Sequence, residues 1–227
     1  MRLRDSLVAV GREAGLPISA WITDMDHPLG LALGNALEVR EVIEALSGGG
    51  PHDLMEITLA LGADMVVLGG VRKDRASARE LLEQLLAQGA VRERFRRNVE
   101  LQGGDPRIVD EPDRLGRAAH VVPVAALSAG YVEDLDPLRL GHAIVDLGGG
   151  RRQPQDAIDP LVGIVLAKVV GDAVTKGETL AFVHASSAAQ AAAAVEQVQA
   201  AYRVGPARIQ RRPLVLTAPD GSAAPSA

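Results

Sequence analysis

The stretch VGIVLAKVVGDAVTKGETLAFVHA, residues Val162 to Ala185, contains two apolar runs on either side of a polar turn. The first run is GIVLAKVV, the second is LAFVHA, and the turn GDAVTKGE between them carries two glycines. Branched and aromatic side chains favour strands, whereas glycine and aspartate favour turns. The stretch therefore predicts a strand hairpin, and it identifies the C-terminal part of the chain as a compact sheet structure.

The pattern GD-x-V-x-x-G-x-x-L in this stretch resembles the hairpin architecture of biotinyl and lipoyl carrier domains. Those domains carry an exposed acceptor lysine at a tight turn, typically within Met-Lys-Met for biotin. The lysines here are Lys168 in LAKVV and Lys176 in VTKGE, and neither has that context. The resemblance is one of architecture and argues against a carrier function.

Further short β-like runs extend this sheet structure in both directions. They are AHVVPVAAL (119–127), HAIVDL (142–147) and, as a last strand, PLVLT (213–217). An alanine-rich helix is predicted from Ser187 to Tyr202. We predict an α+β domain over 121–217 with a compact sheet of the hammerhead or barrel-sandwich type, followed by a disordered tail over 218–227.

The N-terminal part has the 3.6-residue periodicity of helices. We predict a first helix that Gly15 stops, a short strand over Pro17 to Thr23, and a helix over Leu33 to Leu46 that buries Ala36, Val39, Val42, Ile43 and Leu46. A helix from Asp53, with Glu56 in an Asp version of the capping box, is apolar nearly all round and expected to be buried. Another from about Asp74 is expected to bury Leu81, Leu82, Leu85 and Leu86. These elements predict a partial α/β domain over 1–101, and the Gly-, Pro- and Asp-rich composition that follows predicts a linker over 102–120.

Composition narrows the class of protein. The chain has 227 residues, of which 47% are hydrophobic and 2% aromatic, so its core must be aliphatic. The net charge of −5 gives no reason to expect a nucleic-acid partner, and the basic cluster Arg92 to Arg97 is interpreted as a solvated helix face. There is no cysteine, no apolar run long enough for a membrane span, and no signal-peptide pattern. We expect a cytoplasmic protein without a membrane partner.

The polar motif TDMDHPLG, which begins at Thr23, has two interpretations. Asp24, Asp26 and His27 offer metal-binding side chains, but their spacing matches no closed zinc site, and Pro28 favours a turn that these polar groups cap. We prefer the turn. The other histidines singled out, His52, His142 and His184, are interpreted as structural, and no catalytic residue is assigned.

Four stretches of the chain occur in the order seen in the pyrimidine-nucleoside phosphorylases, a family that includes thymidine phosphorylase. The chain resembles the C-terminal half of that family from about Leu7 to Leu216. The stretches are ITDMDHPLGLALGNALEVREVIEALSGGGPHDL, FRRNVELQGGD, LSAGYV and LGGGRRQPQDAIDPLVGIVLAKVVGDAVTKGETLAFVHA.

The resemblance implies phosphorolysis of thymidine or uridine to the free base and a (deoxy)ribose 1-phosphate, with phosphate as the co-substrate. Positioning and cationic stabilisation of the departing base would provide the catalysis. It also implies part of a potassium site, formed by the backbone carbonyls of Leu29 and Ala32 and the carboxylate of Glu41. Oxygen ligands of this kind are also what the residues themselves could offer a hard cation.

Three motifs of the family do not occur in this sequence. They are the Lys-His-Ser-Thr-Gly-Gly phosphate loop, the Arg-Asp-Val-Thr-type base-binding segment and the Ser-x-x-x-Lys helix. They belong to the family's first half, with the helical domain through which its subunits form homodimers. We therefore expect this chain to be inactive alone, as a truncated protein or one half of a split enzyme. The alternative is a non-catalytic binding or regulatory module.

Overall fold

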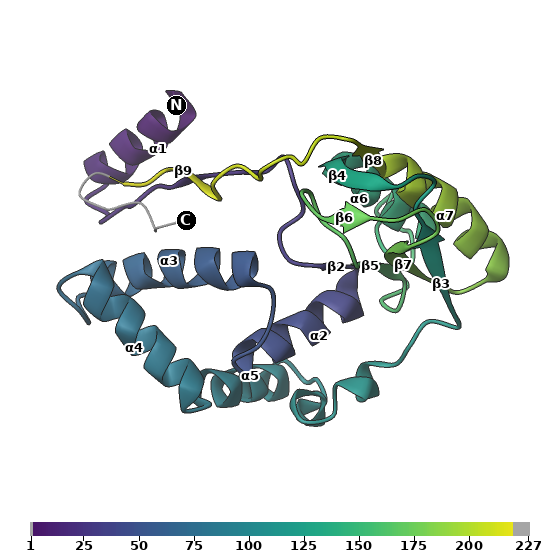
Figure 1. The fold of residues 1–227 in the computed structure, drawn as a ribbon. Helices are drawn as coiled ribbons and strands as arrows, with labels where there is room; N and C mark the ends of the chain where they lie inside the picture. Colours follow the sequence, from purple (N-terminus) through teal and green to yellow (C-terminus); the bar gives the residue numbers. More distant parts are fainter. Residues whose placement is uncertain (1, 220–227) are drawn as a thin grey trace.

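The computed structural model describes residues 2–219 and has an α+β fold in which helices alternate irregularly with antiparallel strands. Figure 1 shows helices α2 to α5 as an arc on one side of the molecule, and the two larger sheets with α6 and α7 on the other. The predicted fold class is therefore confirmed. The sheets are open, so the described residues form no closed barrel.

The first region runs from the N-terminus to two short 3₁₀ helices. Its elements, in chain order, are α1 (Arg2–Glu13), β1 (Ile22–Thr23), β2 (Ala32–Leu33), α2 (Asn35–Leu46), α3 (His52–Leu68), α4 (Arg75–Ala87), α5 (Ala90–Leu101), η1 (Pro106–Val109) and η2 (Pro112–Leu115). Glycines at positive φ separate several of these helices, as at Gly70 and Gly89.

The second region contains the hairpin stretch. Its elements are β3 (His120–Ala125), β4 (Gly130–Leu135), α6 (Pro137–Leu147), β5 (Gly163–Leu166), β6 (Ala173–Val174), β7 (Thr179–Ala185), α7 (Ala188–Ala201), β8 (Tyr202–Gly205) and β9 (Val215–Thr217). Strands β5 and β7 pair antiparallel, with Gly163 opposite His184 and Leu166 opposite Ala181. This pairing confirms the predicted hairpin between the two apolar runs.

Strands cross between the two regions in both directions. The four-stranded sheet has the order β2-β5-β7-β3, so β2 of the first region forms one of its edges. Strand β9 does not extend the sheets of the second region but returns to pair antiparallel with β1 (Figure 1). The three-stranded sheet has the order β6-β4-β8. The division into units at 1–101, 102–120 and 121–217 stays a prediction, and the predicted tail lies outside the described residues from residue 220 onward.

The hydrophobic core lies in the second region. Its fully buried members include Leu135, Leu140, Ile164, Leu180 and Val198, which come from strands and helices on both sides of the hairpin. From the first region, Leu33 packs against this cluster. Burial of aliphatic side chains is the main favourable term in folding, so the second region has the larger share of the packing that stabilises the fold.

Two expectations about local structure are wrong. The run HAIVDL is not a strand but the second half of α6, which Asp136 caps by accepting from the Arg139 N–H at 3.0 Å, with Pro137 in the first turn. Helix α3 begins at His52 with Pro51 before it, and the Asp53 carboxylate accepts from the adjacent Leu54 N–H instead of forming a capping box. In both places a proline sets where the helix begins.

The predicted burial of the first region's helices is also partly wrong. In α3, Leu61, Met65 and Leu68 are 40%, 73% and 41% exposed, although Ile57, Leu59 and Ala63 are buried. In α2, Ala36 and Ile43 are buried, Val39 and Leu46 are half-buried, and Val42 is exposed. In α4 only Ala78 is fully buried, and the four leucines expected inside are half-exposed, namely Leu81, Leu82, Leu85 and Leu86.

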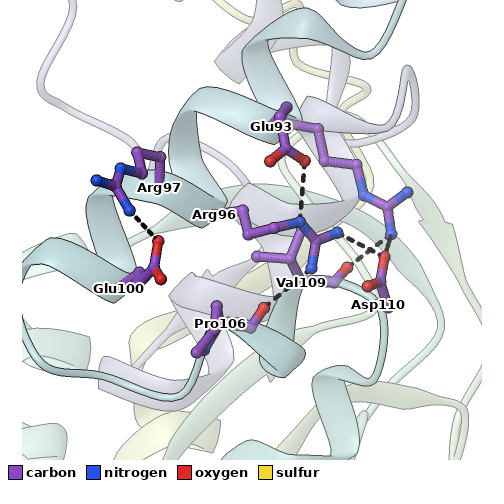
Figure 2. Close-up of polar contacts among 8 residues, drawn as sticks. Glu93, Arg96, Arg97, Glu100, Pro106, Val109 and Asp110 are labelled. Carbon is purple, nitrogen blue, oxygen red and sulfur yellow. Dashed lines mark hydrogen bonds and ion pairs between the residues drawn. The ribbon is translucent and has the colours of Figure 1, made fainter.

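The basic cluster of α5 is not simply a solvated face. Figure 2 shows Arg96 between Glu93 of its own helix and the segment that follows α5. Its guanidinium donates to the Pro106 carbonyl at 3.2 Å and to Asp110 at 2.8 Å, while Arg92 donates to the Val109 carbonyl at 2.7 Å. Arg97, by contrast, pairs with Glu100 at the surface. Arg92 and Arg96 therefore hold the segment around η1 against α5.

Candidate functional site

The polar motif after β1 forms a turn. The Asp24 carboxylate contacts His27 Nδ1 at 3.1 Å and accepts from the Asp26 N–H at 3.3 Å, which is an Asx-turn arrangement. Burial would raise the pKa of Asp24, but the hydrogen bonds with His27 and the Asp26 amide outweigh it, so the pKa lies below its usual value. These contacts match the preferred interpretation, in which the polar side chains cap a turn.

Two arginines from the segment before β9 reach this turn. Arg212 pairs with Asp26 at 2.8 Å, and Arg211 donates to the Pro28 carbonyl at 3.3 Å and pairs with Asp53 at 3.4 Å. Nothing in the sequence indicated this contact, because about 185 positions separate the partners. The C-terminal segment thus fixes the entrance to the Pro-Leu-Gly loop.

Glu41 of α2 holds the other end of that loop. Its Oε1 accepts from the Leu31 N–H at 2.8 Å and from the Ala32 N–H at 3.0 Å. Gly30 lies at φ 73°, and a Cβ at this position would clash with the same carboxylate. Glycine therefore allows the backbone to pass directly over Glu41.

Of the three residues predicted to bind potassium, Leu29 and Ala32 lie in or next to this loop, and Glu41 lies on α2. Leu31 O accepts from Leu166 N at 2.8 Å across the β2–β5 pair, while the Leu31 and Ala32 N–H groups both donate to Glu41. Leu29 makes no hydrogen bond to another described residue. A carboxylate and two backbone carbonyls are ligands that suit a hard cation, so the donor set fits.

The electrostatics of Glu41 are consistent with a cation at this position. Burial raises the pKa of Glu41, and the charges of Asp53 and Glu38 add to this, although the hydrogen bonds from Leu31 and Ala32 oppose it. A bound cation would relieve the same unfavourable interactions. Among residues 2–219 there is no cluster of three or more His, Cys, Asp or Glu side chains able to hold a metal, so any cation here would depend on carbonyl oxygens.

The other histidines lie apart from this loop. His52 is exposed beside Glu56 at 3.8 Å, His142 is exposed on α6, and His184 is half-buried on β7. They share no site.

No helix in the described part of the chain combines the length and apolar character needed to cross a membrane.

A buried carboxylate was missed by the sequence reasoning. Asp64 of α3 is 5% exposed and accepts hydrogen bonds from Ser19, Trp21 and Arg75, whose guanidinium carbon lies 5.6 Å from the centre of the Trp21 ring. The signal was a lone charge in the otherwise apolar run LALGADMVVL. This group ties the approach to β1 to α3 and α4, and through β1 it positions the polar turn.

The chain is similar to known nucleoside phosphorylases over most of its length. Residues 131–205 match the family described as pyrimidine nucleoside phosphorylase C-terminal domain. The chain is 44% identical over 205 residues to the thymidine phosphorylase of Burkholderia cenocepacia (strain HI2424), covering 89% of this chain and 47% of that protein. It is 44% identical over 184 residues to the pyrimidine-nucleoside phosphorylase of Bacillus subtilis (strain 168), covering 81% and 42%.

The chain thus spans about half the length of the curated relatives it matches. The matching domain is the C-terminal one, and the similarity extends beyond it to most of the first region. Over most of its length the chain is therefore similar to the C-terminal half of pyrimidine-nucleoside phosphorylases.

Proposed function

We propose that this chain supplies the C-terminal half of a pyrimidine-nucleoside phosphorylase. In the reaction, a phosphate oxygen attacks C1′ of thymidine or uridine, and the bond from C1′ to the base breaks. The base leaves with the electron pair and takes a proton, which leaves a (deoxy)ribose 1-phosphate. The identity to relatives with this activity in their names, over most of the chain, is the observation that carries the proposal.

The chain is proposed to need a complementary segment, in the same polypeptide or a separate one. The phosphate loop and the base-binding motifs are absent from these 227 residues. Within the described part of the chain, β1 and β9 pair only with each other, so both edges of this two-stranded sheet are open. An open edge is a place where further strands can add.

Apolar faces of two helices support the same proposal. In α1, Leu3, Leu7 and Val10 are 73%, 58% and 65% exposed, and in α3 the exposed residues Leu61, Met65 and Leu68 repeat the same i, i+4, i+7 spacing. This spacing places each set on one face of its helix. Contiguous exposed apolar surface of this kind marks an interaction site, and the complementary segment is the occupant we propose.

The test measures phosphate-dependent release of thymine and uracil from thymidine and uridine. The purified chain alone is expected to release neither base. Mixing it with the part of the Burkholderia cenocepacia relative that lies outside the match is expected to restore release. Turnover by the pure chain would contradict the proposed need for a complement, and failure of every complement would favour a non-catalytic binding or regulatory module.

A matched pair of variants tests which surface the complement uses. Met65→Arg puts a charge on the α3 face, whereas Leu127→Arg puts one on a side chain of similar exposure, 71% against 73%, in the second region. Restored activity and co-purification should be lost with Met65→Arg and kept with Leu127→Arg. Equal effects of the two variants would place the complement elsewhere.

The potassium site at Leu29, Ala32 and Glu41 belongs to the same proposal and has its own readout. Potassium chloride should raise the thermal midpoint above that in tetramethylammonium chloride of equal ionic strength, because a ligand that binds only the folded state stabilises it. Glu41→Gln should abolish the difference, whereas Glu44→Gln, an exposed neighbour on α2, should preserve it. A potassium effect that survives Glu41→Gln would exclude this site. A cytoplasmic location and a homodimer in the completed enzyme are parts of the proposal that these experiments leave aside.

A further inference from the structure

A hollow of about 470 Å³ lies where the two regions meet. It is formed by α2, the segment after η2, strand β3 and strand β7. Its walls are mainly aliphatic and are contributed by Ala36, Leu37, Ala118, Val121 and Leu161. Its size lies within the range of roughly 300–1,000 Å³ that is common for small-molecule sites.

The polar part of the hollow is positively charged. Arg40 and Arg117 both line it, and both donate to the single carboxylate of Asp113, at 2.9 Å in each case. Arg40 also donates to the Gly116 carbonyl at 2.6 Å. Two guanidinium groups therefore share one acidic partner, and no carboxylate is among the residues that line the hollow. An arginine has five N–H donors, so Arg40 retains donors beyond these two contacts.

His184 provides a second polar group in the lining. It lies on β7 opposite Val121 of β3 and Gly163 of β5, and its imidazole makes no hydrogen bond to another described residue. Burial lowers the pKa of His184, and the nearby charge of Arg40 lowers it further. The imidazole is therefore neutral at pH 7, with one N–H to donate and one nitrogen to accept. Asp159, two residues before Leu161, accepts from the Leu161 N–H and the Ser186 hydroxyl.

We propose that this hollow binds a small organic carboxylate with an apolar body. The carboxylate would accept hydrogen bonds from Arg40 and His184, and the apolar body would lie against Val121 and Leu161. Guanidinium–carboxylate hydrogen bonds are among the strongest in proteins, and the unbalanced positive charge favours an anion over a neutral or cationic ligand. This site is separate from the phosphorolysis proposed above and does not depend on it.

Benzoate and benzamide are the probes that test the proposal, because they share a ring and differ in charge. The full chain is titrated with each at pH 7, and the His184 imidazole signal, assigned with His184→Gln, is followed by NMR. Benzoate should bind with a dissociation constant below about 10 mM, and benzamide at least about tenfold more weakly. Absence of benzoate binding, or equal binding of the two, would overturn the proposal.

Two variants and one control locate the binding. Arg40→Gln should weaken the binding of benzoate about tenfold or more, since it removes the charged donor. Arg139→Gln, which removes a surface arginine beside Asp136, should leave the affinity unchanged. Because Arg40→Gln also releases Asp113 and Gly116, Val121→Trp provides a second route. It fills the hollow from an edge strand without changing charge, and it should block benzoate. Unchanged affinity in Val121→Trp would show that the anion binds elsewhere.

Discussion

The two regions of this chain contain similar kinds of residues but use them differently. Apart from Val109 of η1, the largest fully buried side chains all lie in the second region, between Val124 and Val198. In the first region half of the buried apolar residues are alanines, while most leucines and valines of α1, α3 and α4 remain partly or largely exposed. The second region encloses a core of its own, and the first presents apolar faces outward.

Polar contacts are correspondingly more important in the first region. Asp64 joins three segments there, and Arg92 and Arg96 hold the η1 segment to α5 (Figure 2). Such contacts fix geometry, but they contribute less net free energy than close packing of aliphatic side chains. The difference between the regions teaches that a correct helix pattern does not by itself supply a core.

Leu140→Ala should lower the free energy of unfolding by about 2–5 kcal/mol, because it removes a fully buried side chain and leaves a cavity. Leu61→Ala, on the exposed face of α3, should cost less than about 1 kcal/mol. Urea unfolding followed by circular dichroism measures both. Similar losses for the two variants would contradict the contrast between the regions.

Asp64→Asn should lower the free energy of unfolding by about 1–3 kcal/mol, since the three donors lose a charged acceptor in a buried place. Trp21 is the only tryptophan, so its fluorescence reports directly on this site. Burial would raise the pKa of Asp64, but hydrogen bonds from Arg75, Ser19 and Trp21 lower it below 3.8 overall. The stability it contributes is therefore complete above pH 3.8 and is lost as the pH falls further. An unchanged acid transition of the Trp21 signal in Asp64→Asn would argue against this role.

Gly30→Ala should lower the free energy of unfolding more than Gly15→Ala does, although both glycines have nearly the same positive φ, 73° and 71°. The left-handed conformation costs about 1–2 kcal/mol at either position. At Gly30 the added methyl group also meets the Glu41 carboxylate, whereas at Gly15 it meets nothing within 4 Å. Thermal unfolding of the two variants isolates this contact. Equal losses would mean that Glu41 moves aside freely.

Met65→Gln should change the free energy of unfolding by no more than about 0.5 kcal/mol, because this side chain is largely exposed already. Measurements at several protein concentrations sharpen the test. A larger, concentration-dependent loss would indicate that copies of the chain cover the α3 face for one another in solution.

Sequence reasoning found most elements where local signals were strong. Glycines ended the predicted helices, and the hairpin around GDAVTKGE was identified from its apolar runs and turn residues. It failed at HAIVDL because a short apolar run is compatible with either periodicity, and the decisive Asp136-Pro137 start lay outside the run. It also failed on burial in α3 and α4. The periodicity of apolar residues predicts which face of a helix is apolar, but it does not predict what covers that face.

At the candidate sites, too, contacts could be predicted only where the residues are close in sequence. Glu41 and the Pro-Leu-Gly loop are close in sequence, so their proximity could be anticipated. The contact of Arg211 with Pro28, and the meeting of Arg40 with His184, depend on how distant segments are brought together. No local pattern encodes such contacts, so sequence alone could not predict them.

The exchange of strands between the regions has a consequence for the integrity of the chain. Strand β2 completes a sheet otherwise built after residue 119, and β9 pairs with β1 near the beginning. A single proteolytic cut in the segment 102–119 would therefore yield two fragments that each retain a strand in the other's sheet. Such fragments should remain together as a noncovalent complex and separate only on unfolding, so a nicked sample would still migrate as one species under native conditions.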